Sequence, residues 1–152
     1  MSIADTFSPG PDEDDAPVLD PAPLKDYLNA IPAHAAVLDA SGRVMAVNAA
    51  WIRFAERNGG SQDAYLGHNY LTVSDSCADG DAAAVAAGVR AILSGERLEF
   101  WHEYACHSAS DRRWFRCMIS PLRQDGKDVI LGAMVLHVDV TNRKLAEEAA
   151  TQ

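Results

Sequence analysis

The sequence predicts a single α+β domain built on a five-stranded antiparallel sheet with helices on one face. The first observation is the order of patterns: two short strand patterns, then helical patterns, then three more strand patterns. The second is the run from Val129 to Val138, which is almost wholly apolar and typical of a covered central strand. The third is size, because 152 residues, 48% of them hydrophobic, suffice for one domain with a core.

Residues 1–23 predict a disordered tail. The segment is rich in proline and holds six acidic residues without a lysine or arginine, which accounts for −6 of the net charge of −9. It is poor in large apolar side chains, so it cannot bury enough surface to offset the entropy of ordering.

The next segment, residues 24–31, predicts a short flanking helix that ends before Pro32. Leu24, Leu28 and Ile31 share one face of this helix, with Tyr27 beside them. A helix of two turns is marginal alone, so it must pack on its own sheet or on a second chain. We expect these four residues to carry the interface of a homodimer.

A hairpin follows, with strands over His34–Asp39 and Arg43–Asn48 joined by a turn that ends in Gly42. Asn48 is suited to cap a helix over Ala49–Arg57, which presents a broad apolar face.

Two more helical segments are expected, as short turns over 63–73 and as an Ala-rich helix over 79–93. Three strands then follow over 97–105, 114–122 and 129–138, and the first hairpin must pair beside them. Residues 142–152 predict the start of a charged helix that leaves the domain.

Composition also excludes several classes of protein. No apolar run approaches the roughly 18 residues of a membrane span, and the N-terminus lacks the pattern of a signal peptide. Cys77, Cys106 and Cys117 follow no metal spacing and indicate reduced thiols. There is no basic stripe for nucleic acid. We therefore expect a cytoplasmic protein without a membrane or nucleic-acid partner.

Several short stretches follow one another in a characteristic order: Asp39-Ala40-Ser41-Gly42-Arg43-Val44, Val47-Asn48-Ala49-Ala50-Trp51, Gly67, Glu103-Tyr104-Ala105-Cys106-His107-Ser108, Arg113-Trp114-Phe115 and Asp139-Val140-Thr141-Asn142-Arg143-Lys144. By these stretches, the residues from about Leu24 to the end resemble a PAS (Per-Arnt-Sim) sensory domain. The resemblance implies that residues 24–141 enclose a small cavity. It also implies that the domain senses a ligand or redox state, dimerises, and signals through the helix after the last strand.

The resemblance also bears on flavin. The light-sensing members carry Gly-x-Asn-Cys, and the matching run here has Tyr70 in place of the reactive cysteine. Glu103 and Phe115 stand at the positions of flavin-contacting asparagines, and His137 at that of a glutamine. Flavin photochemistry is therefore not expected.

Haem-binding members commonly use a histidine of the long helix, and residues 79–93 contain none. His68 and His137 are the remaining candidates, and a lone histidine on an apolar strand is more often a core residue. We predict no cofactor, with a haem or flavin sensor of gas or light as the alternative. Cys106 and His107 near His102 are read as a turn, since a tetrahedral metal site needs three or four converging ligands.

The predicted function is a non-catalytic sensory and dimerisation module of a signalling protein, with an effector such as a kinase domain if the chain is longer. No catalytic motif is present, and the exit helix argues against a small cavity enzyme. A small molecule or a redox change in the cavity would act on the exit helix through Asp139 and Thr141. The cavity candidates are Trp51, Phe54, Tyr70, Phe115, Cys117, Ile119, Val135 and His137. We read Glu99 and Glu103 as part of a solvated strand face.

Overall fold

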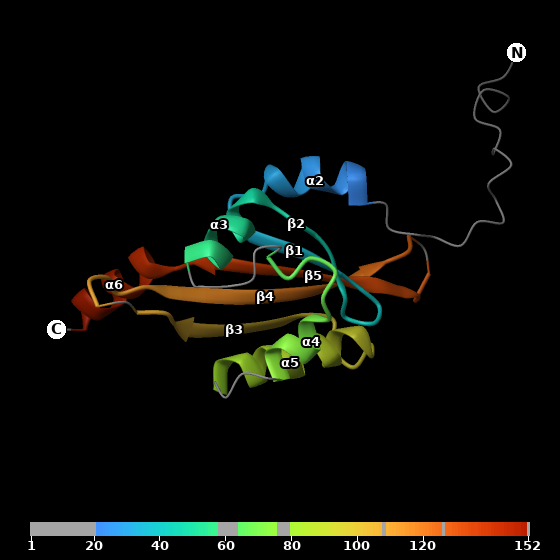
Figure 1. The fold of residues 1–152 in the computed structure, drawn as a ribbon. Helices are drawn as coiled ribbons and strands as arrows, with labels where there is room; N and C mark the ends of the chain where they lie inside the picture. Colours follow the sequence, from blue (N-terminus) through green and yellow to red (C-terminus); the bar gives the residue numbers. More distant parts are fainter. Residues whose placement is uncertain (1–20, 58–63, 76–79, 108, 126, 152) are drawn as a thin grey trace, which may run out of the picture.

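The computed structural model describes residues 21–57, 64–75, 80–107, 109–125 and 127–151 (Figure 1). Most of the tail predicted over residues 1–23, together with Cys77, lies outside the described residues. The predicted tail ends at residue 23, whereas helix α2 spans Pro21–Asn29, so the helix begins three residues earlier than expected. Proline is tolerated in a first helical turn, where its missing N–H has no partner to lose.

The sheet has five antiparallel strands, as predicted, and their order is β2-β1-β5-β4-β3. The strands are β1 (His34–Asp39), β2 (Val44–Val47), β3 (Phe100–Ala105), β4 (Trp114–Arg123) and β5 (Ile130–Asp139). The apolar strand β5 lies at the centre and pairs with β1 on one side and β4 on the other. The first hairpin therefore joins the last three strands through β5, and β3 forms an edge.

Three helices cover the inner face of the sheet. They are α3 (Ala49–Arg57), α4 (Tyr70–Asp75) and α5 (Gly80–Leu93). Their apolar side chains meet those of alternate sheet residues in one cluster, which includes Leu38, Val44, Val89, Ile92 and Ile119. The last helix, α6 (Thr141–Ala150), follows β5 almost directly and has no buried residue.

The outer face is covered in part by α2, which Figure 1 shows on the opposite side of the sheet from α5. Leu28 is fully buried there against Ala35, Val37 and Ala46. The sequence left open whether this helix packs on its own sheet or on a second chain. In the structure, Leu28 packs on its own sheet. Tyr27 remains 73% exposed.

Asn48 joins three elements at this corner of the fold. Its side-chain oxygen accepts the backbone N–H groups of Ala35 and Trp51, at 3.1 and 2.9 Å. Its amide donates to the carbonyls of Leu28 and Ala33, at 3.0 and 2.7 Å. The side chain thus caps α3, as predicted, and also ties the end of α2 to β1.

Candidate functional site

The cavity residues predicted from the sequence converge on the inner face. They come from α3, α4, β4 and β5 and form, with His34 and Tyr104, what we call the inner cluster. Phe54 lies 5.3 Å from Phe115 between ring centroids, and Trp51 lies 5.5 Å from His137 and 6.2 Å from Tyr70. Cys117, Ile119 and Val135 are buried beside these rings.

The polar centre of the inner cluster is a pair of side chains from β3 and β5. The Tyr104 hydroxyl lies 2.7 Å from Nδ1 of His137 in a hydrogen bond. Burial, together with the positive charge that His34 can carry, lowers the pKa of His137 to about 4. Burial also raises the pKa of Tyr104. Both side chains are therefore neutral at physiological pH, and the pair is a hydrogen bond rather than an ion pair.

The sequence missed His34 and Tyr104 as members of this cluster. The signal for His34 was its place at the start of β1, which the sheet register puts opposite His137. The signal for Tyr104 was the alternation along β3, because it pairs with Phe115 and shares its face.

Burial also fixes the character of the thiol in the inner cluster. Cys117 is completely buried, and burial raises its pKa to about 12. A thiol needs its thiolate form to react as a nucleophile. Cys117 is therefore an apolar packing group at physiological pH.

The Gly-x-Asn run that resembles the flavin signature has a structural role here. Gly67 adopts a φ of 83°. The side-chain oxygen of Asn69 accepts the N–H groups of Leu71 and Thr72 at 2.9 and 3.3 Å, which caps α4. The Asn69 amide also donates to the carbonyl of Ser41 in the first hairpin at 3.0 Å. Tyr70 follows as the first residue of α4 and contacts Trp51.

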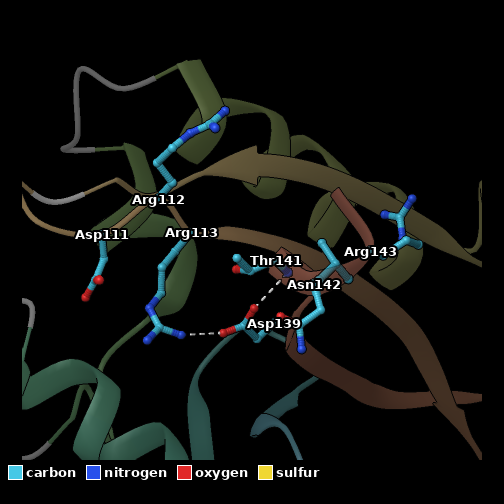
Figure 2. Close-up of a pocket in the computed structure, with 8 residues that line it drawn as sticks. Asp111, Arg112, Arg113, Asp139, Thr141, Asn142 and Arg143 are labelled. Carbon is cyan, nitrogen blue, oxygen red and sulfur yellow. Dashed lines mark hydrogen bonds and ion pairs between the residues drawn. The ribbon is translucent and has the colours of Figure 1, made fainter. Parts of the chain in front are cut away.

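The segment before β4, the end of β5 and the start of α6 form a surface pocket, shown in Figure 2. Its lining residues are Asp111, Arg112, Arg113, Asp139, Val140, Thr141, Asn142 and Arg143. Asp139 accepts a bond from Arg113 at 2.9 Å and from the backbone N–H of Thr141 at 2.9 Å. Burial opposes ionisation of Asp139, but the bonds from Thr141 and Arg113 lower its pKa overall.

Thr141, through which we expect the signal to reach the exit helix, is the first residue of α6 and not its cap. Val140 occupies the capping position and makes no side-chain capping bond. The hydroxyl of Thr141 instead accepts the backbone N–H of Trp114 at 3.1 Å, so it fastens the start of α6 to β4. The carboxylate of Asp139, one residue before Val140, accepts the backbone N–H of Thr141, the first residue of the helix.

Glu103 is the clearest residue that sequence reasoning misplaced. It was assigned to a solvated face, but its side chain is only 17% exposed. Its carboxylate accepts two bonds from Arg116 at 2.9 and 2.6 Å and lies 2.9 Å from Nζ of Lys144. Arg143 donates a further bond to it. The bonds from Lys144 and Arg116, with the charges of Arg143 and Lys144, lower the pKa of Glu103 to about 2 against the effect of burial.

The described parts of the chain contain no group of three or more histidine, cysteine or acidic side chains placed to hold a metal ion. Within the same residues, no helix has both the length and the apolar character that crossing a membrane requires.

Comparisons with known proteins agree with this geometry. The model of the PAS fold family matches residues 28–145. An uncharacterized 104.1 kDa protein in the hypE 3′ region of Rhodobacter capsulatus is 34% identical over 135 residues. The match covers 85% of this chain and 14% of that protein, so the chain spans only a small part of its relative.

Solved structures support the fold at lower identity. The sensor region of a sensor histidine kinase is 21% identical with a TM-score of 0.56, covering 91% of this chain and 47% of that one. A LOV protein of Rhodobacter sphaeroides is 17% identical with a TM-score of 0.56, covering 84% and 71%. With the family model matched over most of the chain and the sheet order in agreement, the chain belongs to the PAS fold family.

Proposed function

We propose that this PAS domain is a non-catalytic sensory module that couples a change in the inner cluster to helix α6 and so to an effector. The observation that carries this proposal is the position of His137. It lies in the centre of the inner cluster and only two residues before Asp139, which bonds the first turn of α6. A displacement of β5 at His137 therefore has a short covalent route to the exit helix.

The stimulus that fits the inner cluster best is a small molecule rather than a redox change. The aromatic rings offer a weakly polar surface, and the Tyr104–His137 pair offers one polar contact. A ligand of this character would compete for that hydrogen bond and so favour one arrangement of β3 and β5 over another. A redox stimulus at Cys117 is disfavoured by the raised pKa of its thiol.

We further propose that the domain works without a bound haem or flavin. Tyr70 fills the position of the reactive cysteine and packs on Trp51, and the long helix α5 carries no histidine that could ligate a haem. The fold shared with a LOV protein keeps a light or gas sensor as the alternative. Purified protein distinguishes the two, because a haem or flavin gives a strong visible absorption band and the proposed module gives none.

A second copy of the chain is the partner we propose for the outer face. Tyr27 on α2 is 73% exposed, and on the same side of the sheet Trp101 and Met118 are 58% and 40% exposed. Exposed large apolar side chains gathered on one face are typical of an interaction site. Leu28 would support this interface from beneath, by fixing α2 on the sheet.

The cellular setting belongs to the same proposal. The relative from R. capsulatus is much longer than this chain, and one structural neighbour is the sensor region of a histidine kinase. We propose that α6 leads to an effector such as a kinase domain, and that the protein acts in the cytoplasm without binding nucleic acid.

Native mass spectrometry of freshly purified protein tests the proposal, because it reports bound ligand and oligomeric state together. The expected result is a dimer that carries an added small-molecule mass or acquires one from a compound library. A monomer that retains and acquires nothing would contradict it. A mass increment that matches haem or flavin would favour the alternative.

A further inference from the structure

Helix α6 is held on the domain by polar contacts. None of its residues is buried, and its charged side chains reach back to strand β3 and to the segment just before β4. Lys144 and Arg143 pair with Glu103 of β3, and Arg112 pairs with Glu148 at 2.8 Å. A helix of ten residues is marginal in water without such support. The order of α6 therefore depends on these ion pairs and on its attachment at Thr141.

Glu103 is the strongest of these anchors. The other pair of α6 with the rest of the domain, Arg112 with Glu148, is about half exposed on both sides, and exposed pairs contribute little. Glu103 is mostly buried and binds two cations of α6 at once. Arg116 fixes the carboxylate from the neighbouring strand and also lies over the Trp101 ring at 4.7 Å, so its own position is set.

The residue next to Glu103 belongs to the inner cluster. Successive side chains of a strand point to opposite faces, so Glu103 faces α6 while Tyr104 faces His137. Among the described strands, β3 lies at an edge and pairs only with β4. A shift of β3 therefore breaks one set of strand hydrogen bonds, where a central strand would break two, although β3 also contacts α5 through His102 and Asp81.

We propose that Glu103 is a latch that holds α6 against the sheet, and that β3 carries a change at Tyr104 to this latch. This inference rests on the proposed sensory function and adds a second route to the exit helix beside β5. Loss of the Tyr104–His137 bond moves β3, and the carboxylate one residue away then leaves Arg143 and Lys144. Helix α6, without buried side chains of its own, becomes mobile.

The latch opens by displacement rather than by protonation. The cations facing Glu103 come from β4 (Arg116) and α6 (Arg143 and Lys144), and together they keep its pKa at about 2. The carboxylate is therefore charged throughout the physiological range, and only geometry can separate it from α6.

Amide hydrogen exchange of α6 tests the latch. In Glu103→Gln the shape is kept and the charge is lost, so exchange from Lys144 to Ala150 should rise about tenfold or more, since charge-assisted bonds are roughly twice as strong as neutral ones. Glu147→Gln is the matched control, because it removes a pair with the same Arg143 inside the helix. It should change exchange far less. The double variant Arg143→Ala/Lys144→Ala removes the cations that bind Glu103, so it should raise the amide exchange of α6 as Glu103→Gln does.

Tyr104→Phe tests the route through β3. It should raise α6 exchange in the wild-type background and add nothing in Glu103→Gln, because both changes act through one contact. Unchanged α6 exchange in both Glu103→Gln and Arg143→Ala/Lys144→Ala would overturn the latch, while the proposed function would stand if Tyr104→Phe still altered α6. Equal effects of Tyr104→Phe in both backgrounds would overturn the β3 route. No effect of Tyr104→Phe on α6 would overturn that route and the proposed coupling together.

Discussion

At the scale of single residues, Asn48 is the polar side chain through which α2, β1 and α3 are joined. It is buried, and four backbone groups depend on it. Asn48→Ala removes these four bonds from buried groups and should lower the free energy of unfolding by about 3 kcal/mol or more. Urea denaturation measures the change. Asn142→Ala, at an exposed position of α6, is the control and should stay within about 0.5 kcal/mol. Equal stability of the two variants would contradict this assignment.

His137 gives the domain a pH dependence with a defined sign. Its pKa is about 4 in the folded chain against 6.5 for an ordinary histidine. Between these values the unfolded chain binds the proton and the folded chain does not, so stability falls as pH drops from about 6.5 to 4. This term is on the order of 3 kcal/mol. Glu103 acts at lower pH, since its stabilising charge is lost between its ordinary 4.5 and about 2.

Unfolding midpoints measured at several pH values check this term. The double variant Tyr104→Phe/His137→Phe keeps two rings of similar shape and removes the ionisable group with its bonding partner. Its stability should vary less between pH 4 and 6.5 than that of the wild type. An unchanged pH profile would show that His137 is not the group responsible.

At this scale, the role of a residue could be predicted from the sequence where its partners are near in the chain. It could not be predicted where the partners come from other elements. The role of Asn48 as a helix cap was visible from its position before an apolar helix. The role of Glu103 was not, because its cations lie 13, 40 and 41 residues away along the chain. A glutamate within an alternating strand pattern carries no local mark of such partners.

At the scale of elements, the packing of α5 on β3 depends on Gly88. An added Cβ there would lie 2.5 Å from ring carbons of Phe100. Alanine would favour the helix by roughly 0.5–1 kcal/mol, but the displaced ring should cost more, so we expect Gly88→Ala to destabilise the fold by about 1–3 kcal/mol. Gly80→Ala, with nothing within 4 Å, is the control for thermal unfolding. A Gly88→Ala chain as stable as the Gly80→Ala chain would contradict this packing.

Most elements were predictable because each has a strong local pattern. The helix over Ala49–Arg57 and the first strand over His34–Asp39 match the prediction, and β5 is central as its apolar run indicated. The region over 63–73 was less clear. Its helix begins only at Tyr70, since Asn69 caps it and Gly67 holds a turn before it. The position of α2 on the outer face had no signal in the sequence, because an amphipathic helix does not specify which surface it covers.

At the scale of the whole molecule, the proposed dimer gives two neighbouring residues of α2 different roles. Tyr27→Asp alters an exposed side chain, so it should weaken the dimer while the unfolding free energy stays within about 0.5 kcal/mol. Leu28→Asp places a charge in the outer-face core and should destabilise the folded chain itself. Size-exclusion chromatography with light scattering and thermal unfolding report the two effects. A wild type that is monomeric, or a Tyr27→Asp chain that remains fully dimeric, would remove α2 from the interface.

The central claim is that a change in the inner cluster reaches the exit helix. The most direct measurement is residue-resolved amide exchange of α6 in Cys117→Ala and in Met118→Ala. These neighbours on β4 point to opposite faces, and Cys117 lies opposite His137 in the register of β4 and β5. The account predicts that Cys117→Ala alters exchange across α6 and that Met118→Ala leaves it near the wild-type level. Equal exchange of α6 in the wild type and in Cys117→Ala would contradict the account.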